Sequence, residues 1–321
     1  MRTLRFLMQS IVASAWIAVG SVALAQEFPS RPIRFIVPNT PGTIHDLGAR
    51  IMGPEMSKIL GQPIIVENKP GSNGLLGYEY VAKHLPADGY AVASTFVGDL
   101  AILPWLFKDL RFDPLKDLPA ILGLAEGRWF FGSPSPAPWK SFVEMVAHAR
   151  ANPGKLNYGA SNTSTRLLTE SIIREIGLDI VHIPYAGGGP YIAALNANEI
   201  QLGFVSESAA GSFGDRFRIL AMTGEQRLAR HPNIPTFAEL GHPQIRGLSL
   251  SLNVAAGTPR AAFDKLSAAA SRALQQAEVR GYFEKIRWEI IDRSPEASAK
   301  VLVDESKVYA DIAKREAIPP H

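Results

Sequence analysis

The chain has 321 residues, of which 46% are hydrophobic and 20% are charged, a balance typical of globular rather than disordered proteins. Its formal net charge is +3 and it contains no long run of lysine and arginine, so nothing indicates binding to nucleic acid. The lack of cysteine excludes disulfides, thiolate metal sites and a cysteine nucleophile. A chain of this length can form two domains of ordinary size.

Residues 1–25 have the pattern of a cleavable secretory signal peptide. Arg2 and Arg5 precede an apolar centre, and Ala23-Leu24-Ala25 matches an A-x-A cleavage site. The alternative is a single membrane anchor, but the apolar run is short and is interrupted by a serine and a glycine. We therefore expect a protein secreted to a bacterial periplasm, whose net charge after cleavage is 3 − 2 = +1.

Between residues 33 and 94 the sequence predicts a repeat of strand, turn, helix and strand. Short β-branched apolar runs bounded by turn residues predict strands, and apolar residues spaced by three and four predict helices. Such a repeat builds a mostly parallel sheet. The strands are expected at 33–37, 64–68 and 90–94, and the helices from Thr43 to Gly61-Gln62-Pro63 and along Tyr78, Val81, Ala82 and Leu85.

The turn after the first strand, Pro38-Asn39-Thr40-Pro41-Gly42, joins the carboxyl end of a strand to the amino end of a helix. Gly42 permits a sharp turn, and Thr43 or Asp46 can satisfy free amides of the first helical turn. The remaining free N–H groups and the helix dipole form an anion-binding site. The alternative is an ordinary βα turn without a ligand.

Beyond residue 120 the composition changes in a way that predicts a second domain. A proline-rich stretch at 133–138 follows an apolar segment, and we expect the chain to cross at 120–133 and to return at 248–255. The predicted domains are 26–125 plus 248–321, and 126–247. Further strands are expected at 155–159, 180–184, 200–204, 217–222 and 288–291, and further helices at 141–150, 259–274, along Leu168, Ile172 and Ile176, and from Ser294 to near Ala317.

Three more turns of the same kind follow predicted strands, at 69–74, 160–165 and 185–190. Ligands of open α/β sheets bind beyond the carboxyl ends of the strands. Two domains that the chain crosses twice can face those ends at each other, and a hinge between them can close on a small molecule. Backbone N–H groups from both sides would then hold an anionic group, most simply a carboxylate.

Several motifs follow one another in a specific order over essentially the whole mature chain. The stretch 38–46 is similar to P-F-x-P-G-G-x-x-D, and the series resembles the Bug family, the TctC-type substrate-binding proteins of tripartite tricarboxylate transporters. The other motifs that carry the resemblance are Gly61 to Gly74, Asp88-Gly89-Tyr90, Phe112 to Asp117, Pro153 to Gly159, His182-Ile183-Pro184-Tyr185, Ile234 to Glu239 and Ala256-Gly257-Thr258-Pro259.

The resemblance implies an α/β, two-domain periplasmic-binding-protein (Venus flytrap) fold, in which each domain is a mixed, mostly parallel sheet flanked by helices. It implies capture of a small carboxylic acid in the cleft between the domains, with no catalytic role, cofactor or metal. The implied partners are the ligand and the membrane components of a transporter, or a sensor that the sequence cannot distinguish from them. We expect a monomer.

Transferring the family's binding loops onto this chain gives the candidate ligand-binding residues. We expect backbone amides of the first and third turns to hold one carboxylate, partly through bridging water. Asp46 is expected to brace the first turn rather than to meet an amino group on the ligand, because a free carboxylate would repel an anionic ligand. The residues are Thr40, Gly42, Thr43 and Asp46, then Ser72, Asn73 and Gly74, then Ser161, Asn162, Thr163, Ser164 and Thr165, and finally Ala186, Gly187 and Gly188.

The chain departs from the family pattern at positions that bear on the identity of the ligand. Thr43 replaces the second glycine of P-G-G, which narrows the turn and adds a hydroxyl. Asp99 stands where serine or threonine is usual, Val205 follows Phe204 where an aspartate is common, and the crossing strand at 248–252 lacks an aromatic residue.

The alternative function is that of a secreted α/β hydrolase that uses Ser161 or Ser164 with a histidine, His182 being the nearest in sequence. A metal pair or acid–base dyad at His45-Asp46 is disfavoured, because adjacent residues of a helix point in different directions. Glu67 is expected to be solvated or paired, and Trp129-Phe130-Phe131 to serve packing.

Overall fold

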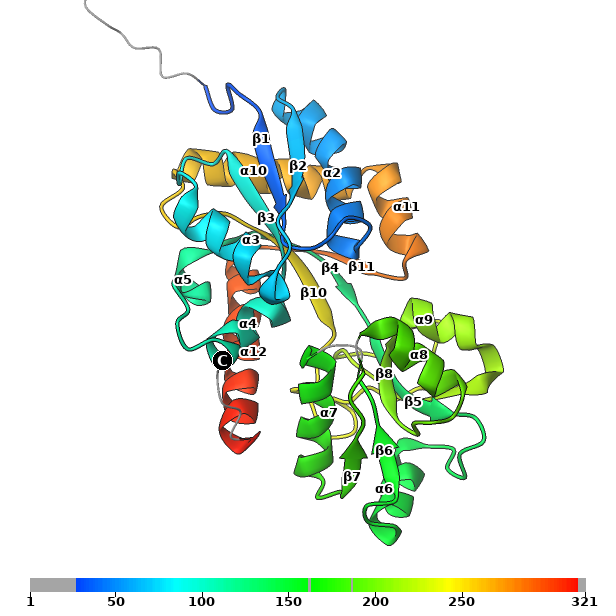
Figure 1. Cartoon of the computed structure of the whole chain (residues 1–321). Coiled ribbons are helices and arrows are strands. Elements are labelled where there is room, and N and C mark those ends of the chain that lie inside the picture. The colour runs from blue at the N-terminus through cyan, green and yellow to red at the C-terminus, as the bar shows by residue number, and fades with distance from the viewer. Residues whose placement is uncertain (1–26, 161–162, 186, 317–321) are drawn as a thin grey trace, which may run out of the picture.

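The computed structural model describes residues 27–160, 163–185 and 187–316, so the predicted leader lies outside the described residues. Figure 1 shows that the chain forms two lobes joined by extended strands. The first lobe is built on a six-stranded sheet, and the second on a three-stranded and a two-stranded sheet. Within the described ranges, no helix is both long enough and apolar enough to cross a membrane.

The six-stranded sheet has the order β11-β4-β10-β3-β1-β2. Its strands are β1 (Ile33–Val37), β2 (Ile64–Asn68), β3 (Ala91–Phe96), β4 (Ala120–Gly127), β10 (Leu248–Asn253) and β11 (Glu289–Arg293). β2, β1 and β3 are parallel, whereas β10 is antiparallel to β3 and β4, and β11 to β4. The sheet is mixed, as predicted. The prediction that it is mostly parallel is wrong beyond β3, because the chain leaves the lobe along β4 and returns along the neighbouring antiparallel strand β10.

Helices cover both faces of this sheet. Alternate residues of a strand point to opposite faces, and accordingly Phe35 and Val37 of β1 belong to one core cluster and Ile36 to another. The first cluster also contains apolar residues of α2 (Ile44–Leu60), α10 (Arg260–Leu274) and α11 (Ala277–Lys285). The second contains those of α3 (Leu75–Glu79), η2 (Tyr80–His84), α4 (Val97–Leu106) and α12 (Pro295–Glu316).

The second lobe packs around an aromatic strand. β5 (Trp129–Pro134) is buried along its whole length and lies between the antiparallel strands β8 (Gly203–Ser206) and β9 (Phe217–Met222). Phe131 and Phe130 face opposite sides of β5 and enter different core clusters, which confirms that the aromatic run serves packing. The lobe also contains α6 (Phe142–Ala151), β6 (Leu156–Tyr158), α7 (Thr163–Glu175), β7 (Ile180–His182), α8 (Gly188–Asn196), α9 (Glu207–Phe213) and η3 (Gly214–Arg216).

Two strands connect the lobes, and their backbones touch at two glycines. β4 ends at Gly127 and β5 begins at Trp129, so the chain changes sheet there without a loop. A Cβ atom on Gly247, just before β10, would lie 2.4 Å from the carbonyl oxygen of Gly127. This close approach requires glycine. The domain boundaries at 125/126 and 247/248 stay predictions.

Several local predictions are confirmed by the structure. β1, β2 and β9 have the predicted bounds, Gly61 ends α2 with φ +71°, and the backbone N–H of Ala297 donates to Ser294 Oγ at the start of α12. β8 was placed too early, and α4, α9, α11 and the four-residue α5 (Pro114–Asp117) were not predicted. α4 escaped detection because most of its residues are apolar and buried, which leaves no polar face to give a helical period.

Candidate functional site

The ends of six strands face the junction between the lobes. β3 and β4 are both antiparallel to β10, so β1, β2 and β3 run in the direction in which β4 carries the chain to the second lobe. In the second lobe, β8 is antiparallel to β5, and a parallel bridge from Tyr158 to Leu202 aligns β6 and β7 with the β8 segment. The carboxyl ends of both sets of strands therefore point at each other, as Figure 1 shows.

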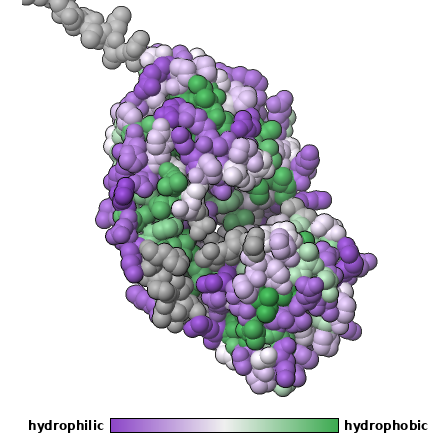
Figure 2. Space-filling view, in the orientation of Figure 1, coloured by the Kyte–Doolittle hydropathy of each residue, from purple (hydrophilic) through white to green (hydrophobic). Residues whose placement is uncertain are grey.

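Each of these six strands leads into a helical segment that begins at the junction. α2 and α4 begin there in the first lobe, and α7 and α8 begin there in the second, together with the shorter η1 (Ser72–Gly74) and α9. The first N–H groups of a helix have no partner within the helix, and its dipole is positive at that end. The junction therefore collects backbone N–H donors from both lobes. Figure 2 shows that the surface is hollowed between the lobes.

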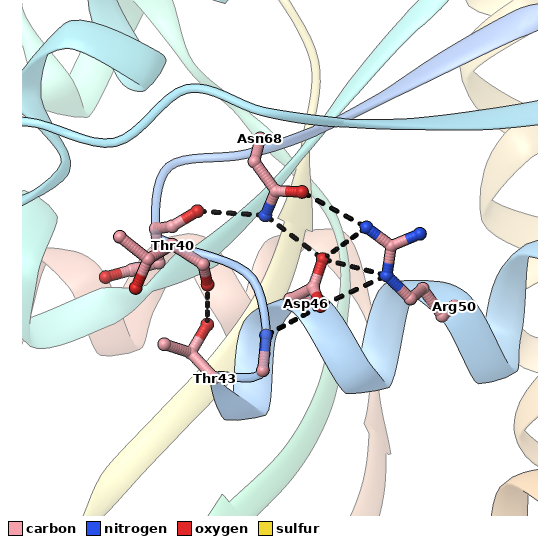
Figure 3. A network of polar contacts seen from close by, with 7 residues as sticks. Thr40, Thr43, Asp46, Arg50 and Asn68 are labelled. Carbon is pink, nitrogen blue, oxygen red and sulfur yellow. Dashed lines mark hydrogen bonds and ion pairs between the residues drawn. The ribbon is translucent and has the colours of Figure 1, made fainter.

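The first turn is held in place by Asp46, as Figure 3 shows. The side chain of Asp46 is buried and accepts hydrogen bonds from the Gly42 backbone N–H (2.9 Å), from Asn68 Nδ2 (3.0 Å) and from Arg50 Nε (3.0 Å). Gly42 has φ +84°, and Thr43 Oγ1 donates to the carbonyl oxygen of Thr40. Bracing by Asp46 is therefore confirmed. Because the Gly42 N–H is already engaged, the free donors of this turn are the amides that follow it.

The charge of Asp46 is compensated within the turn. Burial acts to raise the pKa of this carboxyl, but the hydrogen bonds from Arg50, the Gly42 amide and Asn68 outweigh it, and the pKa lies below its ordinary value. Asp46 is thus ionised at neutral pH, with its negative charge directed at Arg50 and the turn backbone. Asn68 Nδ2 also donates to the carbonyl oxygen of Asn39, which ties β2 to the same turn.

The second turn has a strained backbone with positive φ angles, which its glycines can adopt. Gly71 has φ +137°, Gly74 has φ +85°, and Ser72 has φ +48° although it is not a glycine. A Cβ atom on Gly74 would lie 2.8 Å from the ring of Tyr78, so the turn packs against the core of its own lobe. Ser72 is exposed, and the side chain of Asn73 lies outside the described residues.

The second lobe contributes the amino ends of α7 and α8. α7 begins at Thr163, and Thr165 is 1% exposed. Gly187 precedes α8 with φ +112° and no side-chain cap, and Gly188 is exposed. The remaining predicted residues of these turns fall on parts the structure does not describe: Ser161, Asn162 and Ala186 entirely, and Thr163 and Ser164 in their side chains.

Two turns of the junction were missing from the predicted site. Phe96 precedes α4 without capping it, and its ring centroid lies 3.9 Å from that of His45 and 5.9 Å from that of Trp288. Ser206 precedes α9 and accepts a hydrogen bond from the Ala209 N–H at 3.2 Å. Neither turn contains the cluster of glycine and proline that marked the others, so only the alternation of strands and helices could have indicated them.

The histidines near the junction are held in structural contacts. His45 is 1% exposed, its Nδ1 lies 2.9 Å from Ser94 Oγ, and burial lowers its pKa to about 3, so it is neutral at physiological pH. As predicted, the side chains of His45 and Asp46 lie in different environments. The His182 ring lies 5.0 Å from that of Tyr158, and burial lowers its pKa. In the described part of the chain, no group of three histidine or acidic residues could hold a metal ion.

The family of the chain is shown by a sequence match over most of its length. Residues 49–318 match the model of the tripartite tricarboxylate transporter family receptor, TctC. The chain belongs to the TctC family. Its family and its fold are those of solute-binding proteins rather than of enzymes.

Known members and solved structures agree with this TctC assignment. A Cupriavidus necator protein, the UPF0065 protein in the gbd 5′ region, is 34% identical over 298 residues, which cover 90% of each chain. A Rhodopseudomonas palustris protein solved with adipate has 25% identity and a TM-score of 0.74, covering 92% of this chain and 100% of its own. MatC from the same organism, solved with bound malate, has 27% identity and a TM-score of 0.71, covering 89% and 99%.

Proposed function

We propose that this TctC-family protein captures a small organic acid between its two lobes for uptake by a tripartite tricarboxylate-type transporter. The observation that carries the proposal is the convergence of four helix amino ends, those of α2 and α4 from one lobe and of α7 and α8 from the other. Such ends bind carboxylates through backbone N–H groups. Donors from two lobes can hold one anion only when the lobes are together, so binding favours closure.

The donors proposed for the ligand are backbone N–H groups that are not used within the turns themselves. In the first turn these are the amides of Thr43 and Ile44, because the Gly42 N–H donates to Asp46. In the second lobe they are the amides of Gly188 and Gly189, at the start of α8, and those of the first turn of α7. The other predicted contacts, including Ser72 and Thr165, stay proposals.

The class of ligand is proposed from two structural neighbours. One was solved with malate and the other with adipate, both small dicarboxylic acids. Two sets of amides, one on each lobe, suit a molecule with a carboxylate at each end. We further propose that the protein works in the periplasm as a monomer after removal of residues 1–25, with domains at 26–125 plus 248–321 and at 126–247.

A thermal-shift screen against small mono-, di- and tricarboxylates tests the proposed function. A ligand at about a hundred times its dissociation constant adds about 2.7 kcal/mol of stability, which gives a readable rise of the melting temperature. We expect a rise with at least one acid of the size of malate or adipate, and no rise with the corresponding diamide, because the amide end carries no charge. Equal shifts with acid and diamide, or none with any acid, would contradict the proposal.

A further inference from the structure

A second polar feature lies beside the proposed cleft, where the lobes meet next to the crossing strands. A small cavity of about 30 Å³ is lined on one side by the start of α4 and by α12, and on the other by Trp129, Leu168 and Gln244 of the second lobe. Most of its wall is apolar, but it also contains the carboxyl groups of Asp99 and Glu305, the phenol of Tyr309 and the guanidinium of Arg246. Asp99 lies in the first turn of α4, one of the helix ends proposed to face the ligand, whereas Glu305 lies on α12, outside those turns.

The two carboxyls line the same cavity from neighbouring helices. A Cβ atom built on Gly98, next to Asp99, would lie 3.2 Å from Glu305 Oε2 and 3.2 Å from the hydroxyl oxygen of Tyr309. Glu305 is only 7% exposed, and Asp99 is partly buried. Two acids that share an enclosed apolar space cannot both ionise without a large cost.

The charged groups around the pair do not neutralise it. Burial raises the pKa of Asp99 to about 7 and that of Glu305 to about 8; Glu126 and Asp99 add to the second shift, while Arg246 and Arg293 oppose it without reversing it. Arg293 lies 2.7 Å from Glu126 in a salt bridge of its own. The phenol of Tyr78, on α3, also faces Asp99. Among the described residues of the second lobe that line the cavity, Arg246 is charged, and the raised pKa of Glu305 includes its opposing effect.

The enclosure of the pair depends on contact between the lobes. Leu167 of α7 is 2% exposed and belongs to the core cluster of the first lobe that contains Val97 of α4 and Leu302 of α12. The next residue, Leu168, lines the cavity. If the lobes separate, α7 withdraws from α4 and α12, and water reaches Asp99 and Glu305.

We propose that Asp99 and Glu305 form a proton-binding site whose occupancy is linked to closure of the two lobes. The proposal deepens the proposed function, because closure is the step that would capture the ligand. With the lobes together, the carboxyls are buried and retain their protons; with the lobes apart, they are hydrated and release them.

The direction of the linkage follows from the closed-form pKa values. Because these are raised, the closed form binds protons more tightly, so closure is favoured at low pH and the advantage is lost as the pH rises through about 7 to 8. For Asp99 alone, the closed-to-open ratio should be about tenfold higher at about pH 6 than at about pH 8.5, given an ordinary open-form pKa near 4. Glu305 adds to this effect.

The absence of cysteine allows a test that needs no ligand. Leu115 on α5 and Val143 on α6 are 47% and 67% exposed, one in each lobe, and can be replaced by cysteine for spin labelling. Pulsed electron-spin distance measurements on the ligand-free protein should show the short interlobe distance more often at about pH 6 than at about pH 8.5. The same distance distribution at both pH values would overturn the proposal.

Variants separate this pair from other titrating groups such as the histidines. The variant with Asp99→Asn and Glu305→Gln imitates the protonated pair, so it should show the low-pH distribution at both pH values. Asp304→Asn, on the same helix and paired with Lys300, should retain the wild-type response. A pH response that persists in the double variant would overturn the proposal. Should that variant not fold, Asp99→Asn alone must weaken the response.

The result can be interpreted whether or not the protein binds an acid. A failed ligand screen together with a pH-dependent distance would contradict the proposed function and leave the linkage standing. Binding of an acid together with a distance independent of pH would do the reverse.

Discussion

Gly42→Val is expected to weaken binding of the carboxylate ligand by about a hundredfold or more, about 2.7 kcal/mol, while the protein stays folded. Gly42 has φ +84°, a conformation that a β-branched residue adopts only at a cost of about 1–3 kcal/mol. An added Cβ would contact nothing within 4 Å, so the effect is confined to the backbone of the turn. A turn that relaxes moves the amides of Thr43 and Ile44 away from the ligand. Calorimetric titration measures the loss.

The other end of the same helix provides a matched control. Gly61 follows α2 with φ +71°, and its Cβ position is also free of neighbours within 4 Å. Gly61→Val therefore introduces similar backbone strain at a place remote from the junction. It should lower the melting temperature as Gly42→Val does and leave the affinity unchanged. Wild-type affinity in Gly42→Val would mean that the first turn does not contact the ligand.

Asp46→Ala should lower both the affinity and the free energy of unfolding, the latter by about 3 kcal/mol. The carboxylate accepts hydrogen bonds from the Gly42 backbone amide, from Asn68 and from Arg50, and its removal leaves the amide without its acceptor and Asn68 Nδ2 with only the carbonyl oxygen of Asn39. The turn then loses the group that fixes Gly42. Asp46→Asn retains an acceptor of similar shape and should fall between the wild type and alanine. Urea unfolding and calorimetric titration measure the two effects.

An exposed pair with the same chemistry serves as the control for Asp46. Arg260 and Asp264 on α10 form an i,i+4 pair with an N–O distance of 2.9 Å, and both side chains are largely exposed. Asp264→Ala should change neither the affinity nor the unfolding curve measurably, because solvent screens the pair. If Asp46→Ala behaved in the same way, Asp46 would not brace the turn.

The sequence was sufficient to predict the parts of the site that glycine marks. Gly42, Gly74 and Gly187 all have positive φ at the turns where a strand leads into a helix, so their residue type alone indicated the backbone. The bracing role of Asp46 followed from electrostatics, since an ionised carboxylate facing an anionic ligand is unfavourable. The family resemblance assigned these turns to one binding site, which stays a prediction, whereas the family itself is confirmed by the matched model.

Other features depend on tertiary contacts that no local pattern specifies. Phe96 and Ser206 precede helices of the junction, but neither turn contains the cluster of glycine and proline that marked the other turns. Glu305 and Asp99 line one cavity only because α12 packs against α4. Likewise, the sequence alone does not show whether the Gly42 N–H donates to Asp46 or remains available to a ligand. Only the geometry of the turn decides this.

Amide resonances of the two lobes test the central claim most directly, the claim that backbone groups from both lobes hold one acid. In a titration of the nitrogen-15-labelled protein with adipate or malate, the amides of Thr43 and Ile44 in the first lobe and of Gly188 and Gly189 in the second should shift together, with one dissociation constant. The matching diamide should shift none of them. Shifts confined to one lobe, or centred away from these turns, would contradict the account.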